Sequence, residues 1–213
     1  VMDPGSIIAA RALQVQSGDL VLDMCAAPGG KSLILIEALS QGGGAYLNEL
    51  SPPRRERLKK VIQQYVPRDI RDRVWITGKD AIKFGLSHSE TFDRILLDTP
   101  CSGERHMSAK DKVHWKLSSS QRLAAKQYGL LCSALLALKP KGRLVYSTCS
   151  LSPLESDGVI EKYLKKKTNA KAVSFDFEFE GRNFAQATQF GHIFLPDRCG
   201  FGPIYFAVVE KLT

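Results

Sequence analysis

Short apolar runs alternate with longer amphipathic stretches along most of the chain. A short apolar run closed by an acid or a turn predicts a strand, and apolar residues at every third or fourth position predict a helix. We therefore expect strands at 20–23, 45–49, 74–77, 94–98 and 144–148, with closing strands at 193–195 and 204–209. We expect helices at 31–39, 54–65, 118–138 and 153–167, with residues 139–142 stopping the third. Residues 102–117 are predicted to form a loop, and 173–190 are ambiguous.

This alternation predicts an α/β fold with a doubly wound, mostly parallel sheet. Ligands of such sheets bind beyond the carboxyl ends of the strands. Residues with candidate chemistry fall at those ends, namely Asp23, Glu49, Asp80, Asp98 and Cys149. We find no internal repeat and no linker, so residues 1–213 are expected to form a single domain.

Composition narrows the class of protein. The chain has 213 residues, of which 44% are hydrophobic and 24% are charged, which suits a compact domain with a buried core. No apolar run approaches the roughly 18 residues of a membrane-spanning helix, and no signal peptide is visible, although the chain opens with Val1. The formal net charge of +8 favours a polyanionic partner, either nucleic acid or an anionic membrane surface. The alternative is that the charge only aids solubility.

The cysteines and histidines argue against a metal site and against a disulfide framework. The five cysteines, at 25, 101, 132, 149 and 199, are odd in number and lack Cys-x-x-Cys spacing, and the histidines lack metal-ligand spacing. We expect no metal, and reduced thiols as in the cytoplasm. Cys132 suits packing in an apolar helix, which is the ordinary role of a cysteine. Cys101 and Cys149 each follow a predicted strand, and two thiols that meet an acid at one crevice favour function.

Residues 23–32 connect the first predicted strand to its helix. Gly29 and Gly30 would let the backbone approach a ligand, and the helix N-terminus would offer free N–H groups to a carboxylate or phosphate. The following Lys31 and Ser32 suggest a phosphate-binding P-loop, but that motif needs a glycine where Cys25 stands. The Gly-x-Gly-x-x-Gly pattern is absent too. The loop alone therefore predicts a small ligand at this turn, and an NTPase is disfavoured.

Two acids at later strand ends extend this prediction. Glu49 stands about where a doubly wound fold has the acid that binds ribose hydroxyls, which would serve NAD and S-adenosylmethionine equally well. The alternative is an acid near the start of the next helix. Asp80 could accept a hydrogen bond from an adenine amino group, although an ordinary turn residue is the simpler interpretation.

Three motifs follow the first, fourth and fifth predicted strands: Cys-Ala-Ala-Pro-Gly-Gly-Lys at 25–31, Asp-Thr-Pro-Cys-Ser-Gly at 98–103 and Tyr-Ser-Thr-Cys-Ser-Leu at 146–151. They resemble, in order and spacing, the signature of the Fmu/Sun family of RNA cytosine-C5 methyltransferases, and the segments at 3–6 and 153–155 are similar as well. The resemblance covers nearly the whole chain, apart from 173–190 and the loop after Cys101. It implies the Rossmann-like sheet of class I S-adenosylmethionine-dependent methyltransferases, with residues 1–213 as one catalytic domain.

The resemblance also implies a cofactor and residues that bind it. The cofactor would be S-adenosylmethionine, and Gly29, Gly30 and Lys31 would line its methionine end. Glu49, where relatives often have Asp, would bind the ribose hydroxyls with support from Arg54. The full set of implied cofactor-binding residues is Cys25, Ala26, Ala27, Pro28, Gly29, Gly30, Lys31, Glu49, Arg54, Asp98, and, around the adenine, Asp80 and Ala81.

Three residues are implied to carry the chemistry. Cytosine C5 is a poor nucleophile until a thiolate adds to C6, and this covalent step splits one hard reaction into two easier ones. Spacing leaves open which thiol attacks, because DNA cytosine methyltransferases use the cysteine of a Pro-Cys motif. In the family resembled here the Thr-Cys cysteine attacks, so Cys149 is implied as nucleophile and Cys101 as the group that assists release. Asp98 would reach toward both the cofactor and the cytosine edge.

The implied partner is RNA, with ribosomal RNA preferred over tRNA. The predicted loop carries basic and aromatic residues that suit phosphate contact and base stacking, namely Arg105, His106, Lys110, Lys112, His114, Trp115 and Lys116. A solvated loop is the alternative. Family members carry an N-terminal RNA-recognition region that we do not find here, so we expect upstream residues or a protein partner to supply it.

Other functions on the same fold stay open at this point. One is a methyltransferase acting on DNA or on an amino nitrogen, although Cys101 stands where amino-nitrogen enzymes typically have an aromatic residue. Another is an RNA-binding relative that has lost catalysis, which the presence of Lys31, Glu49, Asp98 and both cysteines disfavours. We expect the protein in the cytoplasm, or in the mitochondrial matrix of a eukaryote, without a membrane partner.

Overall fold

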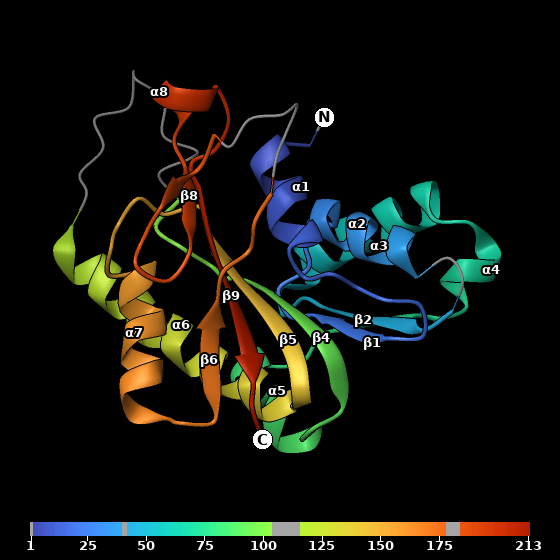
Figure 1. Cartoon of the computed structure of the whole chain (residues 1–213). Coiled ribbons are helices and arrows are strands. Elements are labelled where there is room, and N and C mark those ends of the chain that lie inside the picture. Colours follow the sequence, from blue (N-terminus) through green and yellow to red (C-terminus); the bar gives the residue numbers. More distant parts are fainter. Residues whose placement is uncertain (1, 40–41, 104–115, 178–183) are drawn as a thin grey trace.

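The computed structural model describes residues 2–39, 42–103, 116–177 and 184–213. Strands and helices alternate along most of them (Figure 1). The strands are β1 (Leu20–Asp23), β2 (Gly44–Asn48), β3 (Val74–Thr77), β4 (Phe92–Asp98), β5 (Leu138–Thr148), β6 (Ala170–Val173), β7 (Gln186–Ala187), β8 (His192–Phe194) and β9 (Ile204–Lys211). The helices are α1 (Pro4–Arg11), α2 (Gly30–Ala38), α3 (Pro52–Tyr65), α4 (Arg68–Arg71), α5 (Ala81–Ser87), α6 (Leu117–Ala137), α7 (Asp157–Lys166) and α8 (Pro196–Cys199).

The described strands form one sheet in the order β3-β2-β1-β4-β5-β9-β8-β7, with β6 also paired to β9. β3, β2, β1, β4 and β5 run parallel, whereas β9 is antiparallel to its neighbours. The strand order reverses at β1, since β2 lies on one side of it and β4 on the other. Such a switch point is where doubly wound sheets bind ligands. The predicted fold class is confirmed.

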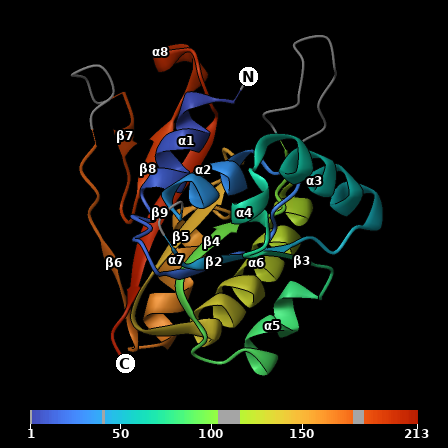
Figure 2. The same cartoon turned by 90° about the vertical axis from the view of Figure 1, so that its right-hand side faces the viewer.

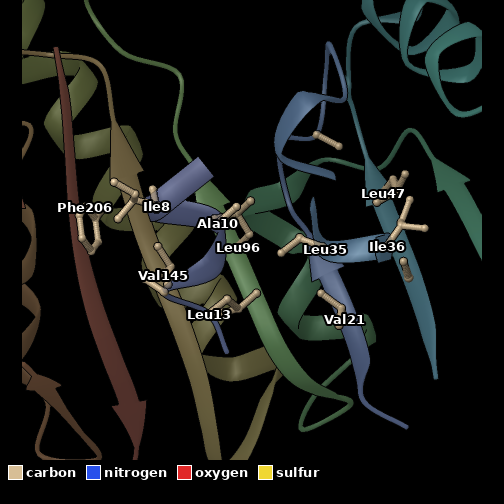
Figure 3. Packing of buried hydrophobic residues seen from close by; sticks show 14 of the residues in the cluster. Ile8, Ala10, Leu13, Val21, Leu35, Ile36, Leu47, Leu96, Val145 and Phe206 are labelled. Carbon is tan, nitrogen blue, oxygen red and sulfur yellow. The ribbon is translucent and has the colours of Figure 1, made fainter. Parts of the chain in front are cut away.

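Helices cover both faces of this sheet (Figure 2). Alternate residues of the central strands supply the two cores. Val21 and Leu96 belong to the core beneath α1, α2 and α3, whereas Leu22 and Leu97 belong to the core beneath α5, α6 and α7. Figure 3 shows the first of these cores, where α1 lies across β4 and β5. Burial on both faces explains why the parallel strands read as short continuous apolar runs.

Helix α1 joins the start of the chain to its last strand. The Asp3 side chain caps α1 by accepting from the Ser6 N–H at 3.0 Å, and it also accepts from the Gly202 N–H at 2.9 Å. Gly5 of α1 packs so closely that a Cβ there would lie 2.6 Å from Cγ2 of Ile204 in β9. The sequence pattern did not predict α1, and this contact between distant residues explains why it forms.

Helices α4, α5 and α8 and strand β6 were not predicted either, and further departures concern the bounds of predicted elements. The helix predicted at 153–167 begins only at Asp157, because the Glu155 carbonyl accepts from the Tyr146 hydroxyl at 2.6 Å instead of joining a helix. Helix α6 ends at Ala137 as expected, but residues 139–142 form an irregularity inside β5 rather than a separate turn. The ambiguous 173–190 contains the end of β6 and β7, and 178–183 lie outside the described residues.

Phe206 of β9 provides a test of the first core. Its ring is fully buried and lies 5.7 Å from the Phe177 ring centroid and 5.5 Å from that of His192. Phe206→Ala should lower the free energy of unfolding by about 3–5 kcal/mol, because it leaves a cavity the packed rings cannot fill. Urea denaturation checks this against Leu86→Ala, whose side chain is 77% exposed. Equal losses in the two variants would contradict the packing described here.

Candidate active site

The turn between β1 and α2 is tied to its neighbours through its backbone. The Met24 N–H donates to the Leu96 carbonyl and the Ala26 N–H donates to the Asn48 carbonyl, both at 2.9 Å. Gly29 has a φ of 114° in the left-handed region, and a Cβ there would lie 3.0 Å from Cδ1 of Leu58 in α3. Only glycine meets both demands, so this position fixes the path of the loop into α2.

Asp23 ends β1 beneath this loop and is almost completely buried. Its Oδ2 accepts from the Ser32 hydroxyl at 2.6 Å, whereas Oδ1 is the buried side-chain oxygen without a partner in the described part of the chain. Burial raises the pKa of this carboxyl to about 7, although the Ser32 hydrogen bond opposes the rise. An orphaned buried acceptor in a cavity wall is a place where a ligand donor fits.

Lys31 and Asp98 form an ion pair across the switch point. Lys31 Nζ donates to Oδ2 of Asp98 at 2.8 Å, and the Ser147 hydroxyl donates to Oδ1 of the same carboxylate at 2.7 Å. Asp98 is thereby held from α2 and β5 at once. The Asp98 side chain remains 33% exposed, so it still faces the space above the sheet.

Glu49 and Arg54 connect the end of β2 to the glycine loop. Glu49 is buried, with its carboxylate accepting from the Ser51 N–H at 2.8 Å and lying 3.4 Å from Arg54 Nη1. Arg54 Nη2 donates to the Ala27 carbonyl at 2.7 Å. Arg54 therefore contacts both Glu49 and the loop, and Glu49 itself is not among the residues that line the cavity above β1 and β4.

Asn48 is a structural residue of the site that the sequence analysis missed. Its amide nitrogen donates to the carbonyls of Met24 at 3.2 Å and Lys79 at 3.0 Å. Its amide oxygen accepts from the Thr77 hydroxyl and the Lys79 N–H, both at 2.9 Å. This buried amide joins the loops after β1, β2 and β3. Its position at the end of β2, beside Glu49, was the only signal in the sequence.

The structure separates Asp80 and Ala81 from the residues described above. Asp80 is exposed and caps α5 by accepting from the Ile82 N–H at 3.1 Å, and Ala81 is buried in the first turn of that helix. Neither lines the cavity above β1 and β4. Their assignment to the adenine therefore stays a prediction, and capping accounts for Asp80 in the structure.

The two cysteines predicted to act together lie side by side. Cys101 follows β4, Cys149 follows β5, and their Sγ atoms are 2.7 Å apart. The hydrogen bond from the Cys149 thiol, with help from backbone N–H groups, lowers the pKa of Cys101 to about 7 despite burial. The same contact, together with burial, raises the pKa of Cys149. These opposite shifts favour a Cys101 thiolate that accepts from the Cys149 thiol, and the geometry of the contact allows either sulfur to be the donor.

A cavity of about 780 Å³ opens above the carboxyl ends of β1 and β4 and brings most of the predicted residues together. The predicted residues in its lining are Cys25, Ala26, Ala27, Pro28, Gly30, Lys31, Arg54, Asp98, Cys101 and Cys149. Asp23, which was predicted at a strand end without a specific role, also lines it, and so does Tyr65, which was not predicted. Residues 104–115, which hold most of the basic predicted loop, lie outside the described residues.

The charges around the cavity suit a ligand that carries both signs. Asp23 and Asp98 would face a cationic group, while Lys31, Arg54 and the N-terminus of α2 would face a carboxylate. S-adenosylmethionine has such a pattern, with a sulfonium, an ammonium and a carboxylate, so these residues fit it. Across the described ranges, no cluster of three His, Cys, Asp or Glu side chains could hold a metal ion, and no helix could span a membrane.

This sheet and cavity define the Rossmann-like fold of S-adenosylmethionine-dependent methyltransferases. A solved structure of NSun6 from Pyrococcus horikoshii with SFG, an analogue of S-adenosylmethionine, superposes with a TM-score of 0.81 at 25% identity, covering 100% of this chain and 53% of that one. An O-methyltransferase from Thermotoga maritima superposes with a TM-score of 0.61 at 15% identity, covering 100% of this chain and 67% of that one. The second likeness supports the fold alone.

Residues 10–210 match the family described as 16S rRNA methyltransferase RsmB/F, and the chain belongs to it. It is 36% identical to the 5-cytosine rRNA methyltransferase NSUN4 of Bos taurus over 100% of this chain and 59% of the relative. It is 32% identical to the mitochondrial tRNA (cytosine(34)-C(5))-methyltransferase of Mus musculus over 99% of this chain and 63% of that relative. It is 41% identical to the ribosomal RNA small subunit methyltransferase F of Aeromonas salmonicida over 72% of this chain and 32% of that relative. The chain thus spans about three fifths of the first two relatives. The predicted family resemblance is confirmed.

The raised pKa of Asp23 predicts an unusual dependence of stability on pH. Between the unfolded pKa of about 3.9 and the folded pKa of about 7, the folded state keeps a proton that the unfolded state has released. Asp23 therefore lowers the free energy of unfolding as the pH rises through this window, by an amount on the order of 4 kcal/mol. Asp23→Asn should remove this decrease in the free energy of unfolding. In urea denaturation from pH 5 to 8, the stability of the variant should therefore rise relative to that of the wild type up to about pH 7.

Asp93→Asn is the matched control for this measurement. Partial burial opposes ionisation of Asp93, but its carboxylate accepts from Lys139 Nζ and the Leu20 N–H, and its net pKa is lowered. From pH 5 to 8 the loss of stability in this variant should stay constant, because a carboxyl with a lowered pKa is ionised in both the folded and the unfolded state across that range. If both variants show the same pH trend, the burial of Asp23 does not control its ionisation.

Proposed function

We propose that this chain is a catalytic domain, spanning residues 1–213, that transfers a methyl group from S-adenosylmethionine to C5 of cytosine in RNA. The observation that carries the proposal is the pair of thiols, 2.7 Å apart, that line the same cavity as the Lys31–Asp98 ion pair. Methyl transfer to an oxygen or an amino nitrogen needs no such pair. The names of the curated relatives, all cytosine-C5 or ribosomal RNA methyltransferases, support the same activity.

The cofactor would occupy the part of the cavity between the glycine loop and Asp98. S-adenosylmethionine, when bound, supplies an electrophilic methyl group on a sulfonium. Lys31 and the N–H groups at the start of α2 would hold its carboxylate, and the orphaned Oδ1 of Asp23 would accept from its ammonium. Glu49, held by Arg54, would bind the ribose hydroxyls, and Asp80 with Ala81 would approach the adenine.

The paired thiols would divide the reaction into attack and release. In the free protein the lowered pKa of Cys101 and the raised pKa of Cys149 favour the shared proton on Cys149, so this proton first passes to the Cys101 sulfur across the 2.7 Å contact. Cys149 then adds to C6 as a thiolate, so the Cys149–C6 bond forms and the electrons of the C5–C6 double bond make C5 nucleophilic. After methylation at C5, Cys101 loses its proton to solvent and takes the hydrogen from C5. The C5–H electrons then restore the C5–C6 double bond, and the electrons of the Cys149–C6 bond return to the sulfur. The pair regains one proton, and Asp98 would steady the cytosine edge throughout.

The proposed substrate is ribosomal RNA in preference to tRNA. The family description and the NSUN4 and small-subunit relatives name ribosomal RNA, whereas one mitochondrial relative names tRNA. The net charge of +8 suits a phosphate backbone. Because this chain spans about three fifths of the first relatives, we propose that further residues or a protein partner complete RNA recognition. Reduced thiols favour the cytoplasm or the mitochondrial matrix as the compartment.

The proposed cofactor site predicts a ligand-dependent gain in thermal stability. S-adenosylmethionine should raise the melting temperature, because it binds only the folded state. Glu49→Ala should reduce that rise, since the buried carboxylate both binds ribose and holds Arg54 near the Ala27 carbonyl. Glu56→Ala, an exposed residue of α3 that pairs with Lys59, serves as control and should keep the wild-type shift. Equal shifts in all three proteins would remove Glu49 from the site.

The two cysteines should have separable roles in methylation. Cys149→Ala should abolish both methyl transfer and any covalent adduct, because no thiolate remains to attack C6. Cys101→Ala should still attack and methylate but should fail to release, so that a denaturant-resistant protein–RNA complex accumulates. The double variant should form no complex, since attack precedes release. A denaturing gel with a labelled transcript of small-subunit ribosomal RNA and S-adenosylmethionine measures all four proteins.

The opposite pattern would overturn this assignment. If Cys149→Ala traps RNA and Cys101→Ala does not, then Cys101 is the nucleophile, as in DNA cytosine methyltransferases. If both single variants still methylate and release at the wild-type rate, the covalent mechanism itself is wrong for this protein. Cys132→Ala, in the apolar part of α6, is the control thiol and should leave methylation unchanged.

A further inference from the structure

A buried carboxylate outside the cavity connects the two cysteine-bearing loops. Glu155 lies in the turn before α7 and has no exposed surface. Its Oε1 accepts from the Ser102 hydroxyl at 2.7 Å, and its Oε2 accepts from the Ser102 N–H at 3.1 Å and from Gln127 Nε2 at 3.0 Å. Ser102 is the residue after Cys101, so the carboxylate holds that loop by two bonds from one residue.

The same cluster also holds the residue before Cys101. The Gln127 amide nitrogen, which donates to Glu155, donates its second hydrogen to the Pro100 carbonyl at 2.9 Å. The peptide groups on both sides of Cys101 are therefore hydrogen-bonded to one buried pair of side chains, Glu155 from the turn before α7 and Gln127 from α6. These hydrogen bonds on both sides of Cys101 limit the positions that its sulfur can take above β4.

A serine pair extends the cluster to the other thiol. The Ser102 and Ser150 hydroxyls lie 2.9 Å apart, and Ser150 is the residue after Cys149. The Ser150 hydroxyl oxygen also accepts from the Ser152 N–H at 3.1 Å, so it is fixed within its own turn. Glu155 thus reaches Cys101 through one residue and Cys149 through two. The resulting contact between loops coincides with the 2.7 Å separation of the sulfurs.

Fold stability alone gives little reason for a carboxylate at this place. A buried ionised group costs several kcal/mol of desolvation unless its hydrogen bonds compensate, and an apolar side chain of the same volume is often as stable. The described donors to Glu155 are neutral groups, and two of them come from the residue after Cys101. A side chain that accepts several hydrogen bonds is needed at this place only if the Cys101 loop must be held in one conformation.

We propose that Glu155, through Ser102 and Gln127, is a positioning residue that keeps Cys101 in contact with Cys149 and thereby sets the rate of the release step. This inference rests on the proposed function, since it assumes that Cys149 attacks and Cys101 assists release. Loss of the carboxylate would let the Cys101 loop move while leaving the cofactor residues on β1, α2 and β2 in place.

Glu155→Gln is the test, because it keeps the shape of the side chain. It replaces one accepting carboxylate oxygen with an NH2 group, which then faces a hydrogen-bond donor and cannot accept from it. We expect kcat to fall about 10- to 100-fold, the range found when a supporting residue lets a reacting group shift. The covalent complex with a labelled small-subunit ribosomal RNA transcript should accumulate, and the S-adenosylmethionine-induced rise in melting temperature should match the wild type. Glu161→Gln, in α7, where an exposed carboxylate pairs with Lys165, is the control and should behave as the wild type.

Combining the substitution with Cys101→Ala separates positioning from general stability. If Glu155 acts through Cys101, the double variant should accumulate the same amount of complex as Cys101→Ala alone. Less complex in the double variant than in Cys101→Ala would mean that Glu155 supports attack or folding instead, and would overturn the inference. Wild-type turnover and release in Glu155→Gln would overturn it as well.

A measurement without RNA keeps this inference distinct from the proposed function. Iodoacetamide alkylation of Cys101, followed by mass spectrometry across pH, should give a midpoint near 7 in the wild type, and in Glu155→Gln a midpoint nearer the ordinary thiol value of about 8.5. An unchanged midpoint would contradict the inference, whereas absence of methylation and of adduct in the wild type and Cys101→Ala would contradict the proposed function alone. If Glu155→Gln does not fold, Ser102→Ala removes the bridging hydroxyl only, and the same outcomes apply to it.

Discussion

Parallel pairing of β1, β4 and β5 is the constraint on which the rest of the site depends. The register sets Asp23 opposite Leu96 and Asp98 opposite Ser147, so that these strands end at one edge of the sheet. Parallel strands cannot be joined by tight turns, and their long connections leave this edge open on both sides of the switch point. Charged side chains that are distant along the chain therefore lie close together at this edge, and none of them has to pass through the hydrophobic core.

Two buried polar side chains make this open edge rigid. Asn48 ties together the loops that follow β1, β2 and β3, and Glu155 ties together the loops that follow β4 and β5. Each satisfies its hydrogen bonds with neutral groups, so neither competes with the charges that face the cavity. The Lys31–Asp98 pair lies between these two buried residues and keeps part of its surface exposed. The site thus combines a fixed frame with a charged interior.

Much of this arrangement could be predicted because its signals are local. Short apolar runs identified β1 to β5, and an acid closed the runs of β1, β2 and β4. The proximity of Cys101 to Cys149 followed from strands that are neighbours in a parallel sheet. Helix α1 could not be predicted, since its buried residues include glycine and serine and reflect contact with β9 rather than a helical period. Asp80 has the position of a cavity acid in the sequence, and in the structure its carboxylate caps α5, a role that the sequence analysis did not assign to it. The bonds of Glu155 join residues far apart in the chain, and no short pattern encodes them.

The contact between α1 and β9 has a consequence for synthesis on the ribosome. Asp3 and Ile204 both line the cavity, and Asp3 is bonded to Gly202 beside β9. β9 is also the strand that covers the outer edge of β5. Because β9 follows the other strands along the chain, they emerge from the ribosome with that edge unpaired and with one wall of the cavity missing. The nascent chain therefore cannot assemble the complete cavity until residues 202–211 have left the exit tunnel, and loading with a small molecule must follow their emergence.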